Sequence, residues 1–316
     1  MTKDLTRNQM YEIILGMRKT YQSGQNAMAF ARKKINEMNE IAGGEGNFIL
    51  CTLVAYDLQT GTYVQNARLN IASNHKWCNQ LSNLISPLLP PDGTLLEVGL
   101  GEATTLAGVL DCLGEKVRQA IGFDISWSRV NEGNLWLKER NQNATLFVGD
   151  LFHIPLANNS IDVVYSSHSL EPNGGAEIEL LTECLRVARH AVVLVEPIYE
   201  LATADAQERM KSHGYVTGLK NAAEKLGAEI IDHRLLEYSV NPLNPSGVLT
   251  LLKKNEGEKK SCSHKVGFIC PLTGANLVMN EDVCFAQDVG IAYPVLRGVP
   301  LLRAEHAVIA STIEPS

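Results

Sequence analysis

The sequence predicts an α/β fold: a seven-stranded sheet with helices on both faces, an N-terminal helical extension and a small C-terminal β-rich domain. Three observations lead to this fold class. Apolar runs and helical patterns alternate from residue 94 onwards, the first run ends in a Gly-x-Gly turn, and the last two runs flank a proline-rich turn. Such alternation pairs strands in parallel through right-handed crossovers, and the turn at 242–247 makes the final pair an antiparallel hairpin.

Residues 1–90 are predicted to form a helical and lid region. Apolar residues recur at helical spacing over 8–38, with a break at Ser23-Gly24, and again over 77–88. The run 48–56 fits either a strand or a buried helical turn, and both alternatives remain open at this point.

The core domain is assigned to residues 91–254. Its strands are expected near 94–98, 119–123, 144–148, 161–166, 190–196, 228–237 and 247–253, with helices at about 103–112, 127–139, 175–187 and 203–226. A charged segment without apolar period predicts a linker over 255–266. Short strands with Pro and Gly follow in 267–316, and so small a domain is expected to dock on the main one.

Composition limits the classes of partner. The 316 residues include 28 Lys and Arg against 35 Asp and Glu, a formal charge of −7, which disfavours a broad nucleic-acid-binding face. Apolar runs are too short to span a bilayer and the N-terminus lacks a signal peptide's apolar core, so a cytoplasmic location without membrane association is expected. The seven scattered cysteines are typical of reduced thiols, and oligomeric state cannot be read from the sequence.

Glycines and acids gather where consecutive strands end. Gly99 and Gly101 allow a sharp turn at which a ligand can approach the backbone, beside a helix N-terminus. Asp124 ends the second strand, where a carboxylate can accept both hydroxyls of a ribose, and Asp150 ends the third, where it can accept an adenine amine. The carboxyl ends of parallel strands form the ligand-binding edge of such sheets, so these residues predict a nucleoside site.

A nicotinamide dinucleotide is the alternative for this geometry. Its fingerprint places a third glycine where this chain has Thr104, and its pyrophosphate would meet the like charges of Glu97 and Glu102. A ligand with an ammonium group and a positive sulfur suits these acids better, because opposite charges attract. S-adenosylmethionine carries both groups.

With these motifs in place, residues 94–253 resemble a class I S-adenosylmethionine-dependent methyltransferase. The segment Glu97–Gly101 is similar to that family's first motif, and 153–164 resembles a passage of its ubiquinone-biosynthesis-like branch. The resemblance implies S-adenosylmethionine as cofactor and a sheet in the order 3-2-1-4-5-7-6. The cofactor-binding residues that it implies are Glu97, Gly99, Gly101, Asp124, Ile125, Asp150, Leu151, Ser167 and, from a lid that precedes the core domain, Tyr63. For Tyr63, packing of the N-terminal helices is the alternative.

Three residues are the predicted catalytic groups. The family places residues beside the transferred methyl after the fourth strand, where His168 can take a proton from an acceptor hydroxyl, or can simply pack under the cofactor. Glu171 can bind acceptor hydroxyls or cap the next helix. Glu196 ends the fifth strand on the same rim, where an acid favours a role in the pocket.

The tail resembles a small zinc-ribbon-like domain that accompanies some RNA- and protein-modifying methyltransferases. Cys270-Pro271, 292–295 and 298–302 carry this resemblance. A zinc site of that type needs Cys-x-x-Cys, but position 273 is threonine, and Cys262, His264, Cys270 and Cys284 have unusual spacing for four ligands. The sequence therefore predicts a tail without metal.

Together these features predict methyl transfer to a small-molecule acceptor, with a hydroxyl of a sugar or related polar metabolite as the favoured group. Two alternatives stay open. One is an RNA- or protein-modifying methyltransferase that uses the tail for substrate docking. The other is a non-catalytic nucleotide-binding scaffold.

Overall fold

The computed structural model describes residues 6–39, 46–239, 241, 243–253 and 265–313, and the chain divides into two units, Met1–Tyr63 and Val64–Ser316. The first unit contains α1 (Arg7–Gln22), α2 (Ala27–Asn39) and α3 (Gly46–Leu58), packed around a small core that includes Met17 and Ala31. The break predicted at Ser23-Gly24 is present, because Gly24 adopts φ 74°. The ambiguous run 48–56 is helical, as part of α3.

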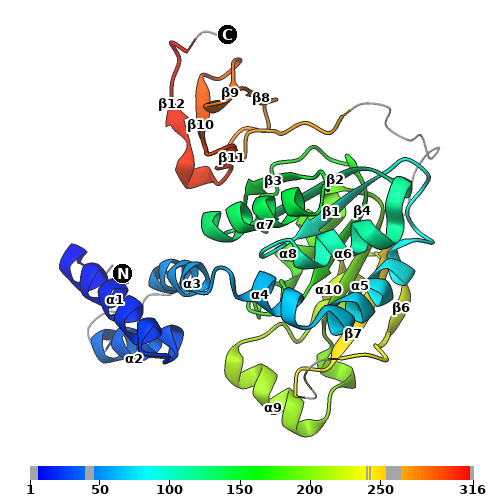
Figure 1. The fold of residues 1–316 in the computed structure, drawn as a ribbon, viewed down its shortest axis with the longest axis horizontal. Coiled ribbons are helices and arrows are strands. Elements are labelled where there is room, and N and C mark those ends of the chain that lie inside the picture. The colour runs from blue at the N-terminus through cyan, green and yellow to red at the C-terminus, as the bar shows by residue number, and fades with distance from the viewer. Residues whose placement is uncertain (1–5, 40–45, 240, 242, 254–264, 314–316) are drawn as a thin grey trace. The chain divides into compact units, whose positions relative to one another are not determined.

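The second unit is organised around a seven-stranded sheet in the order β3-β2-β1-β4-β5-β7-β6 (Figure 1). Its strands are β1 (Gly93–Val98), β2 (Val117–Asp124), β3 (Thr145–Val148), β4 (Ile161–Ser167), β5 (Ala188–Pro197), β6 (Glu229–Leu235) and β7 (Ser246–Leu252). The first five pair in parallel, and β7 lies antiparallel between β5 and β6. The predicted fold class and the reversed final pair are confirmed.

Helices bury both faces of this sheet. Alternation along β1 sends Leu95 into the core beneath α5 (Ile71–Ile85), α6 (Thr104–Leu113) and α7 (Trp127–Glu139). Leu96 points to the opposite core, beneath α8 (Glu177–Val187) and α10 (Leu219–Lys225). Since both faces are apolar and covered, polar side chains gather where the strands end.

One predicted helix is wrong. The segment 203–226 forms two helices, α9 (Ala204–His213) and α10, rather than one. Gly214 adopts φ 67°, and its N–H bonds to the carbonyls of Met210 and Lys211, which ends α9. The loop between α9 and α10 then reaches the segment that follows β4, where the Val216 N–H donates to the carbonyl oxygen of Glu171 (2.9 Å).

The tail forms a second, antiparallel sheet that packs against the edge strand β3. Its strands are β8 (Val278–Met279), β9 (Val283–Ala286), β10 (Ile291–Leu296), β11 (Val299–Pro300) and β12 (Val308–Ile309). The Leu302 N–H donates to the carbonyl oxygen of Val148 (2.8 Å), and Phe268 contacts the ring of Phe147 edge-on. Leu302, Cys270 and Cys284 belong to the same buried core as Leu96, so the tail shares its hydrophobic interior with the sheet.

The linker assigned to 255–266 lies mostly outside the described residues, and so do Cys262 and His264. Within the described ranges, no group of three or more His, Cys, Asp or Glu side chains is arranged to hold a metal ion. The metal-free tail and the four-part division of the chain stay predictions. None of the helices in the described part of the chain has the length and apolar character needed to cross a membrane.

Candidate active site

The turn after β1 is tied to the end of β2. Gly99 and Gly101 adopt φ 65° and 57°, conformations that favour glycine. The carboxylate of Asp124 accepts the Gly101 N–H on one oxygen (3.0 Å) and the Ser126 N–H on the other (2.9 Å). Burial raises the pKa of Asp124, although these amides and the charge of Arg129 oppose the shift. The glycine turn and the predicted ribose acid therefore form one hydrogen-bonded unit.

Glu97 lies below this turn, inside the protein. Its side chain is 2% exposed and accepts a hydrogen bond from the hydroxyl of Tyr165 (2.9 Å). Burial raises the pKa of Glu97 to about 8, so near neutral pH this carboxyl is mostly protonated. Glu97 therefore carries less negative charge near neutral pH than the sequence alone suggests.

Glu102 binds the start of α4 (Thr62–Leu69). Its buried carboxylate accepts the N–H of Val64 (2.8 Å) in the first turn of that helix. Anions stabilise helix N-termini, so Glu102 has a structural use there. Tyr63 is the last residue of the first unit and is 45% exposed. Its role as a lid over the cofactor stays a prediction.

The remaining predicted cofactor residues follow β2 and β3, which are neighbours in the sheet. The Gly149 N–H donates to the carbonyl oxygen of Asp124 (3.1 Å), which joins the two strand ends. Asp150 accepts the N–H of Phe152 (2.9 Å), and Asp150, Leu151 and Ile125 are all partly exposed. The structure thus brings these side chains to the same edge as the glycine turn.

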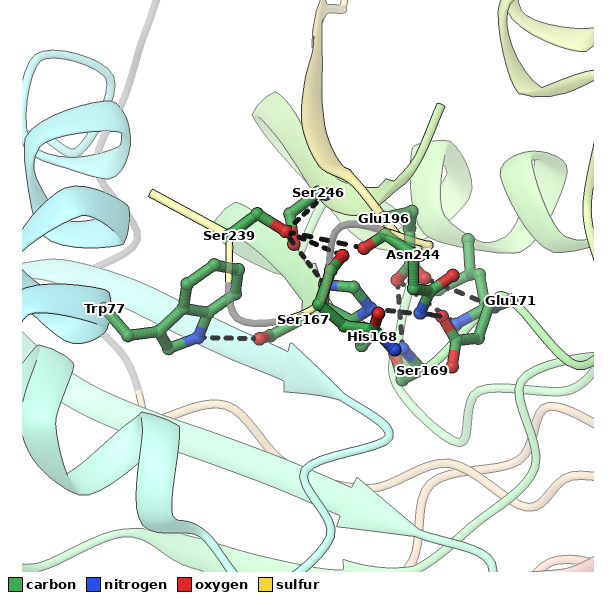
Figure 2. A network of polar contacts seen from close by, with 11 residues as sticks. Trp77, Ser167, His168, Ser169, Glu171, Glu196, Ser239, Asn244 and Ser246 are labelled. Atoms are coloured by element: carbon green, nitrogen blue, oxygen red, sulfur yellow. Dashed lines mark hydrogen bonds and ion pairs between the residues drawn. The ribbon is translucent and has the colours of Figure 1, made fainter. Parts of the chain in front are cut away.

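His168 lies directly after β4, with both ring nitrogens engaged (Figure 2). Its Nδ1 is 3.0 Å from Oε2 of Glu171, and its Nε2 is 2.7 Å from Oγ of Ser246. The residue adopts φ 55°, an uncommon conformation for a residue other than glycine, and its N–H donates to the carbonyl oxygen of Val195 (2.9 Å). The neighbouring Ser167 accepts the indole N–H of Trp77 (3.2 Å).

Glu171 supports His168 and does not cap a helix. Its Oε2 also accepts from the side-chain amide of Asn244 (3.0 Å), whereas α8 begins six residues later with Ala176 at its N-cap. Burial lowers the pKa of His168, but the hydrogen bond to Glu171 and the charges of Glu171 and Glu196 outweigh burial and raise it overall.

Glu196 is fully buried at the end of β5, with 0% exposure. One carboxylate oxygen accepts the N–H groups of Ser169 (3.0 Å) and Leu170 (3.1 Å), and the other accepts the N–H of Glu171 (3.2 Å). Burial raises its pKa to about 7; the positive charge of His168 opposes this shift and the charge of Glu171 adds to it. Its carboxylate therefore binds the backbone of the loop that carries His168.

Sequence reasoning missed the polar groups supplied by the β6–β7 connection. Ser246 begins β7, Asn244 precedes it, and Ser239 lies with its hydroxyl 3.4 Å from that of Ser246 (Figure 2). The signal was available: antiparallel pairing places the start of β7 beside the end of β5, where Ser246 pairs with Pro197. Trp77 carried no such signal.

Comparison with known proteins identifies the central part of the chain. Residues 95–191 match a family model described as a methyltransferase domain. No curated protein is significantly similar to the chain in sequence.

Solved structures of low sequence identity share parts of the fold. The chain is similar to magnesium protoporphyrin IX methyltransferase from Synechocystis with bound SAH (12% identity, TM-score 0.49, covering 64% of this chain and 99% of that one). It is also similar to a SAM-dependent methyltransferase from Aquifex aeolicus (18% identity, TM-score 0.40, 54% and 88%). A third is a chain of the complex between the Haloferax volcanii Trm112 methyltransferase activator and a methyltransferase (12% identity, TM-score 0.47, 62% and 96%).

None of these likenesses assigns a substrate to this chain. The glycine turn, Asp124 and strands β2, β3 and β4 lie within the matched residues. The chain carries a methyltransferase domain over residues 95–191.

Proposed function

We propose that this enzyme transfers a methyl group to a hydroxyl oxygen of a small polar acceptor, such as a sugar or related metabolite, with His168 as general base. The observation that carries the proposal is the pair formed by Glu171 Oε2 and His168 Nδ1, 3.0 Å apart at the carboxyl end of β4. The His168 side chain is 26% exposed, which leaves room for contact with a ligand. A carboxylate on one ring nitrogen orients an imidazole and stabilises its protonated form.

The residues at the strand ends fit the cofactor. A Cβ on Gly99 would lie 2.3 Å from Cβ of Ser169, so the turn is closed on that side and its glycine is required. A carboxylate offers about four acceptor sites, and the backbone N–H groups of Gly101, Ser126 and Ile125 act on Asp124. We assign the ribose to Asp124 and the adenine edge to Asp150. When bound, the cofactor supplies an electrophilic methyl group on a positive sulfur.

The chain's own residues then accept the proton of the acceptor hydroxyl. With its Nδ1 proton donated to Glu171, neutral His168 has its lone pair on Nε2, where the Ser246 hydroxyl donates. That hydroxyl also lies 3.4 Å from Oγ of Ser239, so it can turn to Ser239 when an acceptor hydroxyl takes its place at Nε2. His168 then receives the acceptor proton as the new bond to oxygen forms, and Glu171 stabilises the resulting cation.

Two finer resemblances belong to this proposal. Residues 153–164 are similar to the ubiquinone-biosynthesis-like branch, and 267–316 to a methyltransferase-partner domain whose zinc motif has been lost. The net charge of −7 disfavours RNA as the acceptor.

The test is incubation of the enzyme with radiolabelled S-adenosylmethionine and a size-fractionated cell extract. We expect label in the small-molecule fraction, stable to conditions that hydrolyse esters, and about 10²–10⁴-fold less of it with His168→Ala. Label in protein or RNA would show that the acceptor is macromolecular. Label that is unchanged in His168→Ala would exclude His168 as the base.

The cofactor placement has its own test, which needs no acceptor. We expect Asp124→Ala to weaken binding of S-adenosylhomocysteine by roughly 1.5–3 kcal/mol, because a charged acceptor of hydrogen bonds is removed. Calorimetric titration measures this loss. The exposed Asp288 on the tail provides the matched control, since Asp288→Ala should leave the affinity unchanged. Equal affinity in Asp124→Ala and wild type would place the ribose elsewhere.

A further inference from the structure

The loop 168–171 touches both halves of the candidate site. On one side it carries His168, whose ring is held by Glu171. On the other side the Ser169 hydroxyl donates to the carbonyl oxygen of Val98 (2.6 Å), the last residue of β1. The Ser169 side chain lies against Gly99, since a Cβ there would be 2.3 Å from Cβ of Ser169. The base and the glycine turn are therefore fixed relative to each other by this short loop.

A single buried carboxylate binds this loop from below. Oε1 of Glu196 accepts the N–H groups of Ser169 and Leu170, and Oε2 accepts the N–H of Glu171. Successive N–H groups that converge on one anion form a concave binding site for negative charge. At 0% exposure, the Glu196 side chain that fills this site is itself shielded from any ligand.

We propose that Glu196 is a positioning residue rather than a catalytic one: its carboxylate holds the loop 168–171 so that Ser169 supports the cofactor turn at Gly99. Each of the two carboxylate oxygens of Glu196 binds a different part of the loop. Oε1 fixes the part of the loop that meets the cofactor turn, and Oε2 fixes the part that carries Glu171. Cofactor affinity therefore depends on a residue that the cofactor does not touch.

This inference makes a graded prediction for substitutions. Glu196→Gln keeps one acceptor oxygen for Ser169 and Leu170, but its NH₂ group cannot accept the N–H of Glu171. Glu196→Ala removes all three acceptors. We expect affinity for S-adenosylhomocysteine to fall about 3–10-fold in Glu196→Gln and more than about 30-fold in Glu196→Ala. Glu200→Ala, which removes an exposed acid four residues further on, should leave the affinity unchanged.

A double-mutant cycle tests whether the effect passes through Ser169. Ser169→Ala removes the hydrogen bond to Val98 and should itself weaken binding several-fold. If both residues act on the same turn, the losses in Glu196→Gln/Ser169→Ala will be smaller than the product of the single losses. Independent, multiplicative losses would overturn the proposed route.

The cofactor's charge separates positioning from electrostatics. S-adenosylmethionine has a positive sulfur and S-adenosylhomocysteine a neutral one, so a positioning role predicts equal losses for both ligands. A loss confined to S-adenosylmethionine would show that Glu196 acts by its charge, and unchanged affinity for both would remove the inference. The inference rests on the cofactor placement proposed above. A wild-type protein that is folded but does not bind S-adenosylhomocysteine would overturn that placement first.

Discussion

At the scale of single residues, the partners of His168 determine the pH at which it becomes a base. The hydrogen bond and charge of Glu171 overcome burial and raise the pKa of His168 above its usual value of about 6.5. A general base works in its neutral form, so methyl transfer should increase with pH through a midpoint above 6.5. We expect NMR titration of the His168 ring to show this midpoint without any acceptor present.

Substitution of Glu171 tests whether this residue raises the pKa of His168. Glu171→Gln removes the negative charge beside Nδ1, and the pKa of His168 should then move down. Glu200→Gln, at an exposed position, is the control and should leave the midpoint in place. A midpoint that stays unchanged in Glu171→Gln would show that Glu171 does not set the basicity of His168.

Glu97 gives a second pH dependence, this time of stability. Burial raises its pKa from the usual 4.5 to about 8, so the folded protein holds this proton between about pH 4.5 and 8 while the unfolded chain releases it. A group with a raised pKa costs stability as pH rises through that window. Glu97→Gln is uncharged at every pH and can still accept from Tyr165.

We therefore expect the free energy of unfolding of Glu97→Gln to improve relative to wild type as pH increases from 5 to 8. The gain is at most about 1.4 kcal/mol per pH unit. Urea unfolding at several pH values, without cofactor, measures it, and the exposed control Glu200→Gln should show no such trend. Curves that run parallel to wild type would mean that Glu97 ionises normally in the fold.

At the scale of elements, the turn between β1 and α6 and the loop after β4 meet at Gly99. A Cβ at this position would lie 2.3 Å from Cβ of Ser169, and φ is 65°. Gly214 has a similar φ of 67° in the left-handed helical region, but a Cβ there would meet no neighbouring atom within 4 Å, so it is a control for backbone strain alone. We expect Gly214→Ala to cost only about 1–2 kcal/mol of stability.

Gly99→Ala should cost more stability than Gly214→Ala, because it adds a collision to the strain of a positive φ, and should weaken S-adenosylhomocysteine binding at least about tenfold. Thermal unfolding and calorimetric titration measure the two effects. Combining Gly99→Ala with Ser169→Gly removes the opposing Cβ. The double variant should regain part of the lost stability and part of the lost affinity. If Gly99→Ala lowers stability no more than Gly214→Ala, the contact with Ser169 has no influence on the turn.

Sequence pattern predicted the elements better than the contacts between them. The order of strands and the reversed last pair followed from alternating apolar runs, which is a local signal, and from the resemblance. The division of 203–226 was missed because apolar spacing continues across Gly214, which ends the first helix. A glycine at the end of a helical run is a common stop signal, as at Ser23-Gly24, but periodicity alone does not reveal it.

In the candidate site, too, the sequence predicted the positions of residues better than their contacts. Strand-end positions brought Asp124, His168 and Glu196 to one rim in the sequence argument, and the structure places them there. The direction of each side chain was not predictable: Glu196 points inward to three amides because the loop after β4 folds back over β5. Ser246 comes from 78 residues beyond His168, and only strand pairing reveals it.

At the scale of the whole molecule, the tail and the sheet share one core. Leu302 is fully buried among residues of both, and its N–H extends the hydrogen bonding of β3 through Val148. A small domain whose apolar side chains complete another domain's core has little stability of its own. We therefore expect the tail and the sheet to unfold in one cooperative transition.

Leu302→Ala tests this directly. Removal of a buried leucine side chain costs about 2–5 kcal/mol, which for a unit of this size lowers Tm by roughly 2–4 °C per kcal/mol. We expect a single calorimetric transition at a lower temperature, with circular dichroism lost over the same range. Leu296→Ala, at a side chain that is 48% exposed on β10, should shift Tm by no more than about 2 °C.

Separate transitions would contradict a shared core. In that case Leu302→Ala would move only a small, early transition, and the main transition would keep its wild-type midpoint. S-adenosylhomocysteine distinguishes the two outcomes further, since a ligand stabilises only what unfolds together with its site. In one cooperative unit the ligand raises the Tm of the tail as well as that of the sheet, and it does so equally in wild type and Leu296→Ala.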